Sequence, residues 1–173
     1  MSEDWLTAAS RTVRAARIDP SLPNVARVWN FLIGGRDNFE ADRQAARQLV
    51  AAAPVMEYVA PASRAFLRRA VTFMTAEAGI SQFLDVGTGM PTAGNTHEVA
   101  QAINPASRVV YVDNDPVVLA HARAGLRSSD EGATSYLDAD ARDTKTIVVG
   151  AAETLDLDRT GIAAKVNGVP FRG

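Results

Sequence analysis

The sequence predicts an α/β protein: an open parallel sheet with right-handed crossovers, preceded by an N-terminal helical arm. Up to about residue 79, apolar residues recur at helical spacing. From residue 80, short apolar runs alternate with turn residues and helical stretches, as in buried parallel strands joined by crossover helices. A length of 173 residues, 47% of them hydrophobic, allows one sizeable core. We therefore expect one structural unit, made of the arm (residues 1–79) and a sheet domain (residues 80–173).

Three helices are expected in the arm. The first carries an apolar stripe, which should face the core, and ends at a glycine pair. The second begins at a capping-box spacing and ends at a proline, and the third ends at a glycine. In chain order, the residues that mark these helices are Val25, Val28, Trp29, Leu32 and Ile33 (the stripe), Gly34 and Gly35, Asp37 and Glu40 (the capping box), Pro54, Glu57 to Ala78, and Gly79.

Three strands are expected in the sheet domain: Gln82 to Val86, Arg108 to Val112 and Thr134 to Leu137. Asp115 followed by Pro116 has the order of an N-cap and a first helical residue, so a helix should begin there. The residues that this helix should turn toward the core are Val118, Ala122 and Leu126.

Composition excludes several classes of function. Eighteen basic and twenty acidic residues give a net charge of -2, so no global basic field exists to hold nucleic acid by its phosphates. The absence of cysteine excludes disulfides and thiolate metal sites, and two histidines are too few for a histidine-built zinc site. No apolar run approaches a membrane span, and the first residues lack a signal-peptide core. We expect a cytoplasmic protein without a metal, nucleic-acid or membrane partner.

Candidate ligand residues follow each expected strand, where open α/β sheets bind ligands. Asp85, Gly87 and Gly89 surround the end of the first strand, and the glycines allow a tight turn against a ligand. Asp113, twenty-four residues beyond Gly89, can accept hydrogen bonds from both ribose hydroxyls. After the third strand, Asp140 can accept one from an adenine amino group. With their neighbours, the predicted cofactor site comprises Asp85, Gly87, Thr88, Gly89, Asp113, Asn114, Asp140 and Ala141.

The glycine spacing favours one adenosine cofactor over another. A dinucleotide-binding loop has the spacing G-x-G-x-x-G, which brings a helix N-terminus onto a pyrophosphate. Here Thr92 stands at the third glycine position, and Gly94 comes two residues later. Pro91 also lacks the N–H that a phosphate would use. These features favour S-adenosylmethionine, which has no pyrophosphate, over NAD.

Five stretches of the chain are distinctive: IDPSLPNVARVWNFLIGGRDNFEADRQAA, SRAFLRRAV, QFLDVGTGMPTAGNTHEVAQ, RVVYVDNDPVVLAHARAGL and YLDADARD. Together they resemble the S-adenosyl methyltransferase family of Rossmann-like class I fold, found in high-GC bacteria and long labelled a domain of unknown function. The resemblance covers about Ile18 to Asp143. It implies that Asp85, Gly87 and Gly89 line the methionine end of S-adenosylmethionine, Asp113 the ribose and Asp140 the adenine. It also implies a lid over the site, formed by the arm residues Asn30, Gly34, Gly35, Asp37 and Asn38.

The resemblance decays after Asp143. A complete class I methyltransferase sheet has a fourth strand, whose end often supplies groups that face the acceptor, and further strands beyond it. The later apolar runs, Ile147 to Val149 and Ile162 to Val166, precede no recognisable catalytic loop. We therefore expect a shortened fold that keeps the cofactor half and lacks the fourth strand and most of the acceptor half. An exposed sheet edge should then promote self-association, for example as a homodimer.

The leading hypothesis is an S-adenosylmethionine-dependent methyltransferase, or a shortened form of one, acting on an unknown small-molecule acceptor. No catalytic residue is assigned, because the sulfonium already makes the methyl group electrophilic, and alignment with exclusion of water supplies much of the acceleration. One alternative is a non-catalytic module that only binds S-adenosylmethionine. Another is an NAD-binding oxidoreductase, which the glycine spacing disfavours.

Several further residues are interpreted as structural. Two histidines should lie on helix surfaces, three arginines on a solvated helix face, and one tryptophan in the core. These residues are His97 and His121, Arg64, Arg68 and Arg69, and Trp29. For Asp140, the alternative to ligand binding is a solvated turn or cap residue.

Overall fold

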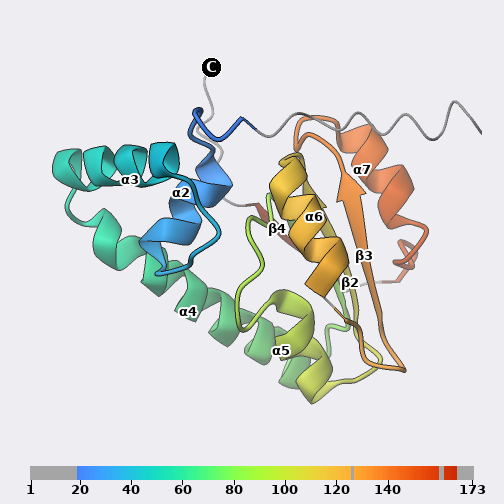
Figure 1. Ribbon diagram of the computed structural model, residues 1–173. Helices are drawn as coiled ribbons and strands as arrows, with labels where there is room; N and C mark the ends of the chain where they lie inside the picture. Colours follow the sequence, from blue (N-terminus) through green and yellow to red (C-terminus); the bar gives the residue numbers. More distant parts are fainter. Residues whose placement is uncertain (1–18, 126, 160–161, 167–173) are drawn as a thin grey trace, which may run out of the picture.

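The computed structural model describes residues 19–125, 127–159 and 162–166, and these confirm an α/β fold with an N-terminal helical arm (Figure 1). The predicted strands and helices are present, with bounds within a few residues of those expected. In chain order the elements are α2 (Val25–Leu32), α3 (Glu40–Ala52), α4 (Met56–Ala76), β1 (Gln82–Val86), α5 (Thr96–Ile103), β2 (Arg108–Asp113), α6 (Pro116–Gly125), β3 (Ala133–Asp138), α7 (Thr144–Ala151) and β4 (Ile162–Val166). Leu126, expected in the core, lies outside the described residues.

The strands of the described residues form one parallel sheet in the order β3-β2-β1-β4. The chain passes outward from β1 to β2 and β3 and then returns to the far side of β1. Strand order therefore reverses between β1 and β4, which is where open α/β sheets bind ligands, at the carboxyl ends of the strands. The expectation that a fourth strand is lacking is wrong, because residues 162–166 pair with β1 along its whole length.

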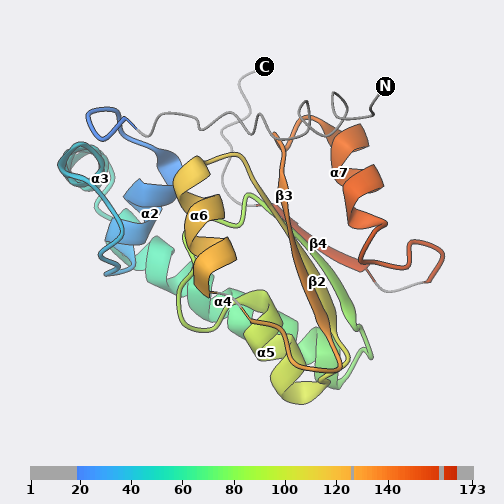
Figure 2. The ribbon, with the colours of Figure 1, turned by 45° about the vertical axis from the view of Figure 1, so that its right-hand side comes forward.

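Side chains of the sheet alternate between two apolar cores, as the pleat requires. Phe83 and Val109 face α4 and α5, whereas Val110 and Val112 face α7. Figure 2 shows α7 on the opposite side of the sheet from α4 and α5. The residue Asp85 and its register partner Tyr111 belong to the α4 and α5 side, because each lies two positions beyond a residue of that core.

The residues that are buried in the arm differ from those predicted from the sequence. Helix α2 has the expected bounds, but its fully buried residues are Arg27 and Asn30, whereas Val25 of the apolar stripe is 64% exposed. Trp29, expected in the core, is only half-buried. Helix α3 begins at Glu40 rather than at Asp37, and the carboxylate that accepts the Phe39 N–H is that of Asp42.

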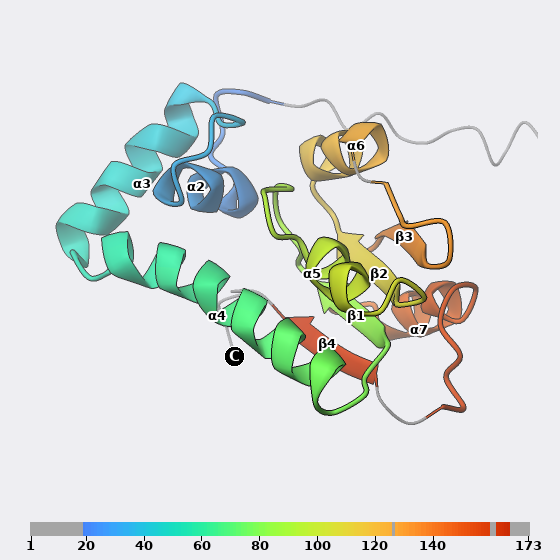
Figure 3. The same ribbon diagram turned by 90° about the horizontal axis from the view of Figure 1, so that it is seen from below.

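Helix α4 joins the arm to the sheet. It runs beside α5 and also contacts α2 and α3, so that one long helix holds both parts of the fold (Figure 3). Its buried face carries Ala60, Leu67, Val71 and Thr75. Gly79 follows its end with φ +68°, a left-handed conformation that glycine adopts without strain. No helix within the described ranges has the length and apolarity to cross a membrane.

Candidate functional site

The loop after β1 turns tightly across the end of β2. The backbone N–H groups of Gly87 and Thr88 both donate to the Val112 carbonyl, at 2.8 and 3.2 Å. Gly87 and Gly89 have φ values of +67° and +69°, which disfavour any residue with a side chain. A Cβ added at Gly89 would have no heavy atom within 4 Å, so this part of the loop borders open space. A ligand can therefore approach the backbone here.

Asp113 joins the glycine loop to the end of β2. Its carboxylate accepts hydrogen bonds from the N–H groups of Gly89, at 2.8 Å, and Asp115, at 2.9 Å. Burial raises the pKa of Asp113, and the backbone hydrogen bonds of Asp115 and Gly89 oppose that rise. An ionised carboxylate has about four acceptor positions, so Asp113 retains capacity for ligand hydroxyl groups.

Asp85 lies beneath the same loop and is buried. Its Oδ2 accepts a hydrogen bond of 2.7 Å from the hydroxyl of Thr96, the first residue of α5. The contact ties the end of β1 to the start of the following helix, with the glycine loop between them. The structure thus brings Asp85, Gly87, Gly89 and Asp113 together at one edge of the sheet.

Asp140 has a different environment. Both of its carboxylate oxygens already accept hydrogen bonds from Arg142, at 2.9 Å from Nε and 2.6 Å from Nη2. These contacts hold the pKa of the half-buried Asp140 carboxyl well below its usual range. Nearby, Asp143 caps α7 by accepting the Thr146 N–H. Adenine recognition by Asp140 stays a prediction, and Arg142 would have to share the carboxylate with the ligand.

The remaining predicted neighbours surround these groups. Thr88 is half-buried in the glycine loop, and Asn114 is exposed between Asp113 and the start of α6. Ala141 is half-buried and packs against the core on the α7 side of the sheet. None of these three side chains forms a hydrogen bond within the described residues. Their contacts with a cofactor stay a prediction.

Arg64 reaches this site from the arm, which the sequence interpretation missed. Its Nη2 donates to the Thr92 hydroxyl and, at 3.4 Å, to the Asn95 side-chain oxygen, both in the segment between the glycine loop and α5. The expectation of a solvated helix face is therefore wrong for Arg64, although Arg68 and Arg69 are exposed. The signal was its spacing: four residues after Ala60 and three before Leu67, Arg64 belongs to the buried face of α4.

His97 is also misplaced by the sequence interpretation. It is 2% exposed, and its Nδ1 lies 2.8 Å from the hydroxyl oxygen of Tyr111. That oxygen accepts the His97 backbone N–H, so its own hydrogen can be donated to Nδ1 of a neutral imidazole. Tyr111 in turn stacks on Tyr136, with ring centroids 5.0 Å apart. The spacing of His97 and Ala100 on the buried face of α5 indicated this burial.

The neutral His97 predicts a pH-dependent stability. Burial lowers the pKa of His97 below that of the unfolded chain, about 6.5, so the unfolded state binds more protons in that range. Neutral His97 makes its full contribution to the free energy of unfolding above about pH 6.5. This contribution is lost as the pH falls through the folded-state pKa of His97. Between about pH 7.5 and about pH 5.5, the free energy of unfolding should fall less for His97→Asn than for the unsubstituted chain. Urea unfolding at the two pH values measures this difference. His121→Asn, at an exposed histidine, is the control; equal losses in all three proteins would contradict the prediction.

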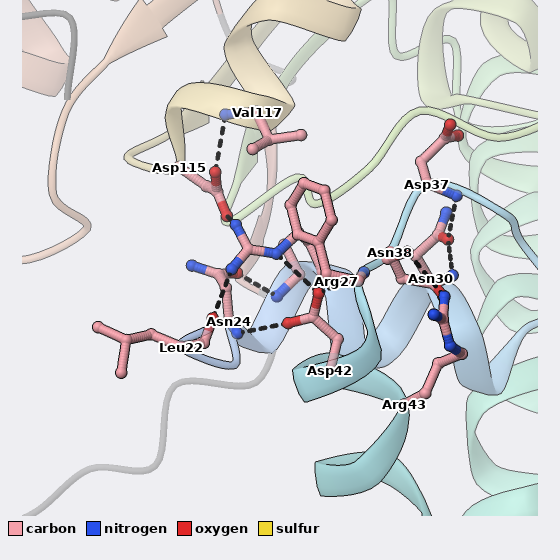
Figure 4. A network of polar contacts seen from close by, with 12 residues as sticks. Leu22, Asn24, Arg27, Asn30, Asp37, Asn38, Asp42, Arg43, Asp115 and Val117 are labelled. Carbon is pink, nitrogen blue, oxygen red and sulfur yellow. Dashed lines mark hydrogen bonds and ion pairs between the residues drawn. The ribbon is translucent and has the colours of Figure 1, made fainter. Parts of the chain in front are cut away.

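A buried ion-pair network holds the arm beside the site (Figure 4). Arg27 donates from Nε to Asp42, at 2.9 Å, and its Nη1 lies 3.5 Å from Asp115, two residues beyond Asp113. Its remaining nitrogen donates to the Leu22 carbonyl. The Asp115 carboxylate also accepts the Val117 N–H and so begins α6. Arg27 thereby connects two arm segments to the turn that follows Asp113 at the end of β2.

The predicted lid residues form a compact turn inside the arm. The Asn30 side-chain oxygen accepts hydrogen bonds from the Asp37 N–H, at 3.1 Å, and from the Asn38 side chain, at 2.9 Å. A Cβ at Gly35 would lie 2.3 Å from the Asn30 side-chain nitrogen, so a side chain there would have to displace that of Asn30 and disturb its hydrogen bonds. Asp37 is exposed, and Figure 4 shows its carboxylate pointing away from Asn30. Their role as a lid stays a prediction.

One small pocket lies away from this site. It has a volume of about 150 Å³ and is found at the amino ends of β1 and β2, opposite the glycine loop. Hydrogen bonds between Gln82 and the backbone of Asp156 close one side of it. Since these contacts join the sheet to the loop after α7, we regard the pocket as structural.

Comparison with known proteins identifies relatives of this chain. The model of a family described as S-adenosyl methyltransferase matches residues 11–169. The crystal structure of a DUF574 family protein from Streptomyces avermitilis MA-4680 is 43% identical, with a TM-score of 0.81 over 86% of this chain and 57% of that chain. That of a "putative methyltransferase" from Thermobifida fusca YX is 44% identical, with a TM-score of 0.77 over 88% of this chain and 57% of that one. No curated protein matches. The chain thus spans 57% of the length of each of these two solved proteins.

Proposed function

The chain belongs to the S-adenosyl methyltransferase family, and from this premise we propose that it binds S-adenosylmethionine at the carboxyl ends of β1 and β2 for methyl transfer to a small-molecule acceptor. The observation that carries the proposal is the pairing of Asp113 with the glycine loop. The methyl transfer and the class of acceptor are proposed rather than shown, because the chain spans 57% of the length of the two solved relatives.

The residues at this edge suit the cofactor. Open space beside Gly89 leaves room for a ligand against the loop, and the spare acceptor capacity of Asp113 suits a ribose diol. When bound, S-adenosylmethionine would supply an electrophilic methyl group on a positively charged sulfur. The protein residues would bind and orient it: Asp113 by accepting from ribose, the glycine loop by close backbone approach, and Asp85 with Thr96 by holding that loop in place.

Calorimetric titration tests the proposal. We expect S-adenosylmethionine and S-adenosylhomocysteine to bind, and NAD to bind at least about 10-fold more weakly, because Thr92 stands where a dinucleotide-binding loop has its third glycine. Binding of NAD alone, or of none of the three, would overturn the proposal.

Two alanine variants locate the binding to the loop. Gly89→Ala should weaken S-adenosylhomocysteine binding by at least about 10-fold, because it adds a Cβ toward the ligand space and disfavours the required positive φ. Gly79→Ala is a matched control: it also has a positive φ and an open Cβ position, but it lies at the end of α4. Equal affinities of the two variants would place the ligand elsewhere.

A further inference from the structure

Arg64 is a half-buried cation that forms no ion pair with an acidic side chain of the described residues. Within the described residues its hydrogen bonds go to two neutral oxygens, those of the Thr92 and Asn95 side chains. Burial lowers the pKa of Arg64, and the fields of Asp85, Tyr111 and Glu98 oppose that shift. A partly desolvated guanidinium whose hydrogen bonds go to neutral oxygens is favourably placed to bind an anion.

The position of Arg64 relates it to the glycine loop. Thr92 lies three residues after Gly89, and its N–H donates to the same Asn95 oxygen that Arg64 approaches. Asp113 holds the glycine loop at Gly89, and Arg64 holds the segment that follows this loop at Thr92. If S-adenosylmethionine lies along the loop with its ribose at Asp113, its methionine end can therefore extend toward Arg64.

Arg64 also has donors to spare. A guanidinium presents five N–H groups in a planar fork, and only Nη2 of Arg64 has a hydrogen bond within the described residues. A carboxylate is the anion that matches this fork, because its two oxygens can accept two parallel N–H bonds. S-adenosylmethionine has one anionic group, the α-carboxylate of its methionine part.

We propose that Arg64 binds this α-carboxylate and makes the site selective for ligands that carry it. The inference rests on the proposed function and adds to it a binding residue from the arm. Because α4 belongs to the arm and the glycine loop to the sheet domain, the cofactor would contact both parts of the fold. Arg64 would then both anchor the loop through Thr92 and bind the ligand.

A pair of ligands that differ only in the carboxylate tests the proposal: S-adenosylmethionine and its decarboxylated form. By calorimetry, the unsubstituted chain should bind S-adenosylmethionine at least about 10-fold more tightly than the decarboxylated ligand. In Arg64→Gln this ratio should fall to about 1, since only the carboxylated ligand loses a partner. Arg69→Gln, an exposed arginine of the same helix, should keep the full ratio.

The possible results of this titration separate the role of Arg64 from the proposed function. An unchanged ratio in Arg64→Gln, or equal affinities of both ligands for the unsubstituted chain, would overturn the role of Arg64 but leave the proposed function standing. If neither ligand binds the unsubstituted chain, the proposed function itself fails. Arg64→Lys serves if the Gln variant does not fold: it keeps the charge but loses the fork, so the ratio should fall by a smaller factor.

Discussion

Replacing Asp113 by alanine is expected to lower the affinity for S-adenosylhomocysteine by at least about 100-fold. Two charge-assisted hydrogen bonds from the ribose hydroxyls would be lost, each worth roughly 1.5–3 kcal/mol. The change also removes the acceptor for the Gly89 and Asp115 N–H groups, which holds the glycine loop against β2. Calorimetric titration measures the affinity, and circular dichroism shows whether the variant is folded.

Two comparisons separate ligand binding from loop structure. Asp138→Asn is the matched control, because Asp138 is the register partner of Asp113 on β3 but is exposed; its affinity should be unchanged. A 2′-deoxy analogue of the ligand should bind the unsubstituted chain more weakly than the parent, and Asp113→Asn should reduce this difference. If the two ligands differ equally in both proteins, Asp113 does not bind the ribose 2′-hydroxyl.

Replacing Arg27 by methionine is expected to destabilise the fold by about 3–5 kcal/mol, the cost of leaving buried carboxylates without their cation. Asp42 and Asp115 are 0% and 2% exposed, and Arg27 is their shared partner. Methionine retains much of the apolar stem, so most of the loss should be electrostatic rather than a packing defect. Urea unfolding followed by circular dichroism measures the free energy of unfolding.

A surface arginine provides the control for this prediction. Arg47 pairs with Glu40, and both side chains are more than half exposed, so Arg47→Met should cost no more than about 1 kcal/mol. Adding Asp42→Asn to Arg27→Met should recover part of the loss, because one buried charge disappears with its partner. A cost similar to that of Arg47→Met would mean that the network contributes little to the docking of the arm.

Features that depend on near neighbours in the sequence were predicted well. Strand β1 has the predicted bounds, because a short apolar run between turn residues identifies a buried parallel strand. Asp115 caps α6 as expected, since its acceptor and the Val117 N–H are two residues apart. Gly87 and Gly89 have positive φ values, as the predicted tight turn of the glycine loop allows. Placing Asp85, the glycines and Asp113 at one edge needed only the rule that parallel strands end on the same side.

Features that depend on distant partners were missed. Arg27 and Asp115 are 88 residues apart, and Arg64 and Thr92 are 28 apart, so neither contact leaves a pattern in the local sequence. The prior that charged side chains and histidines lie at the surface then gave the wrong environment for Arg64 and His97. In the same way, the fourth strand is a short run whose assignment depends on its pairing with β1.

Local sequence chemistry therefore determined the first three strands, the cap of α6, the α/β class and the cofactor loop of this protein. Helical spacing could indicate the burial of Arg64 and His97, but only the tertiary structure decided what each buried polar group contacts. The physical reason is that burying a charge is costly unless a partner meets it, and only the folded chain brings that partner within reach. For the glycine loop, the sequence predicted a backbone turn that a ligand can approach. The fold added that Asp113 holds this loop at Gly89 and that Arg64 holds the following segment at Thr92.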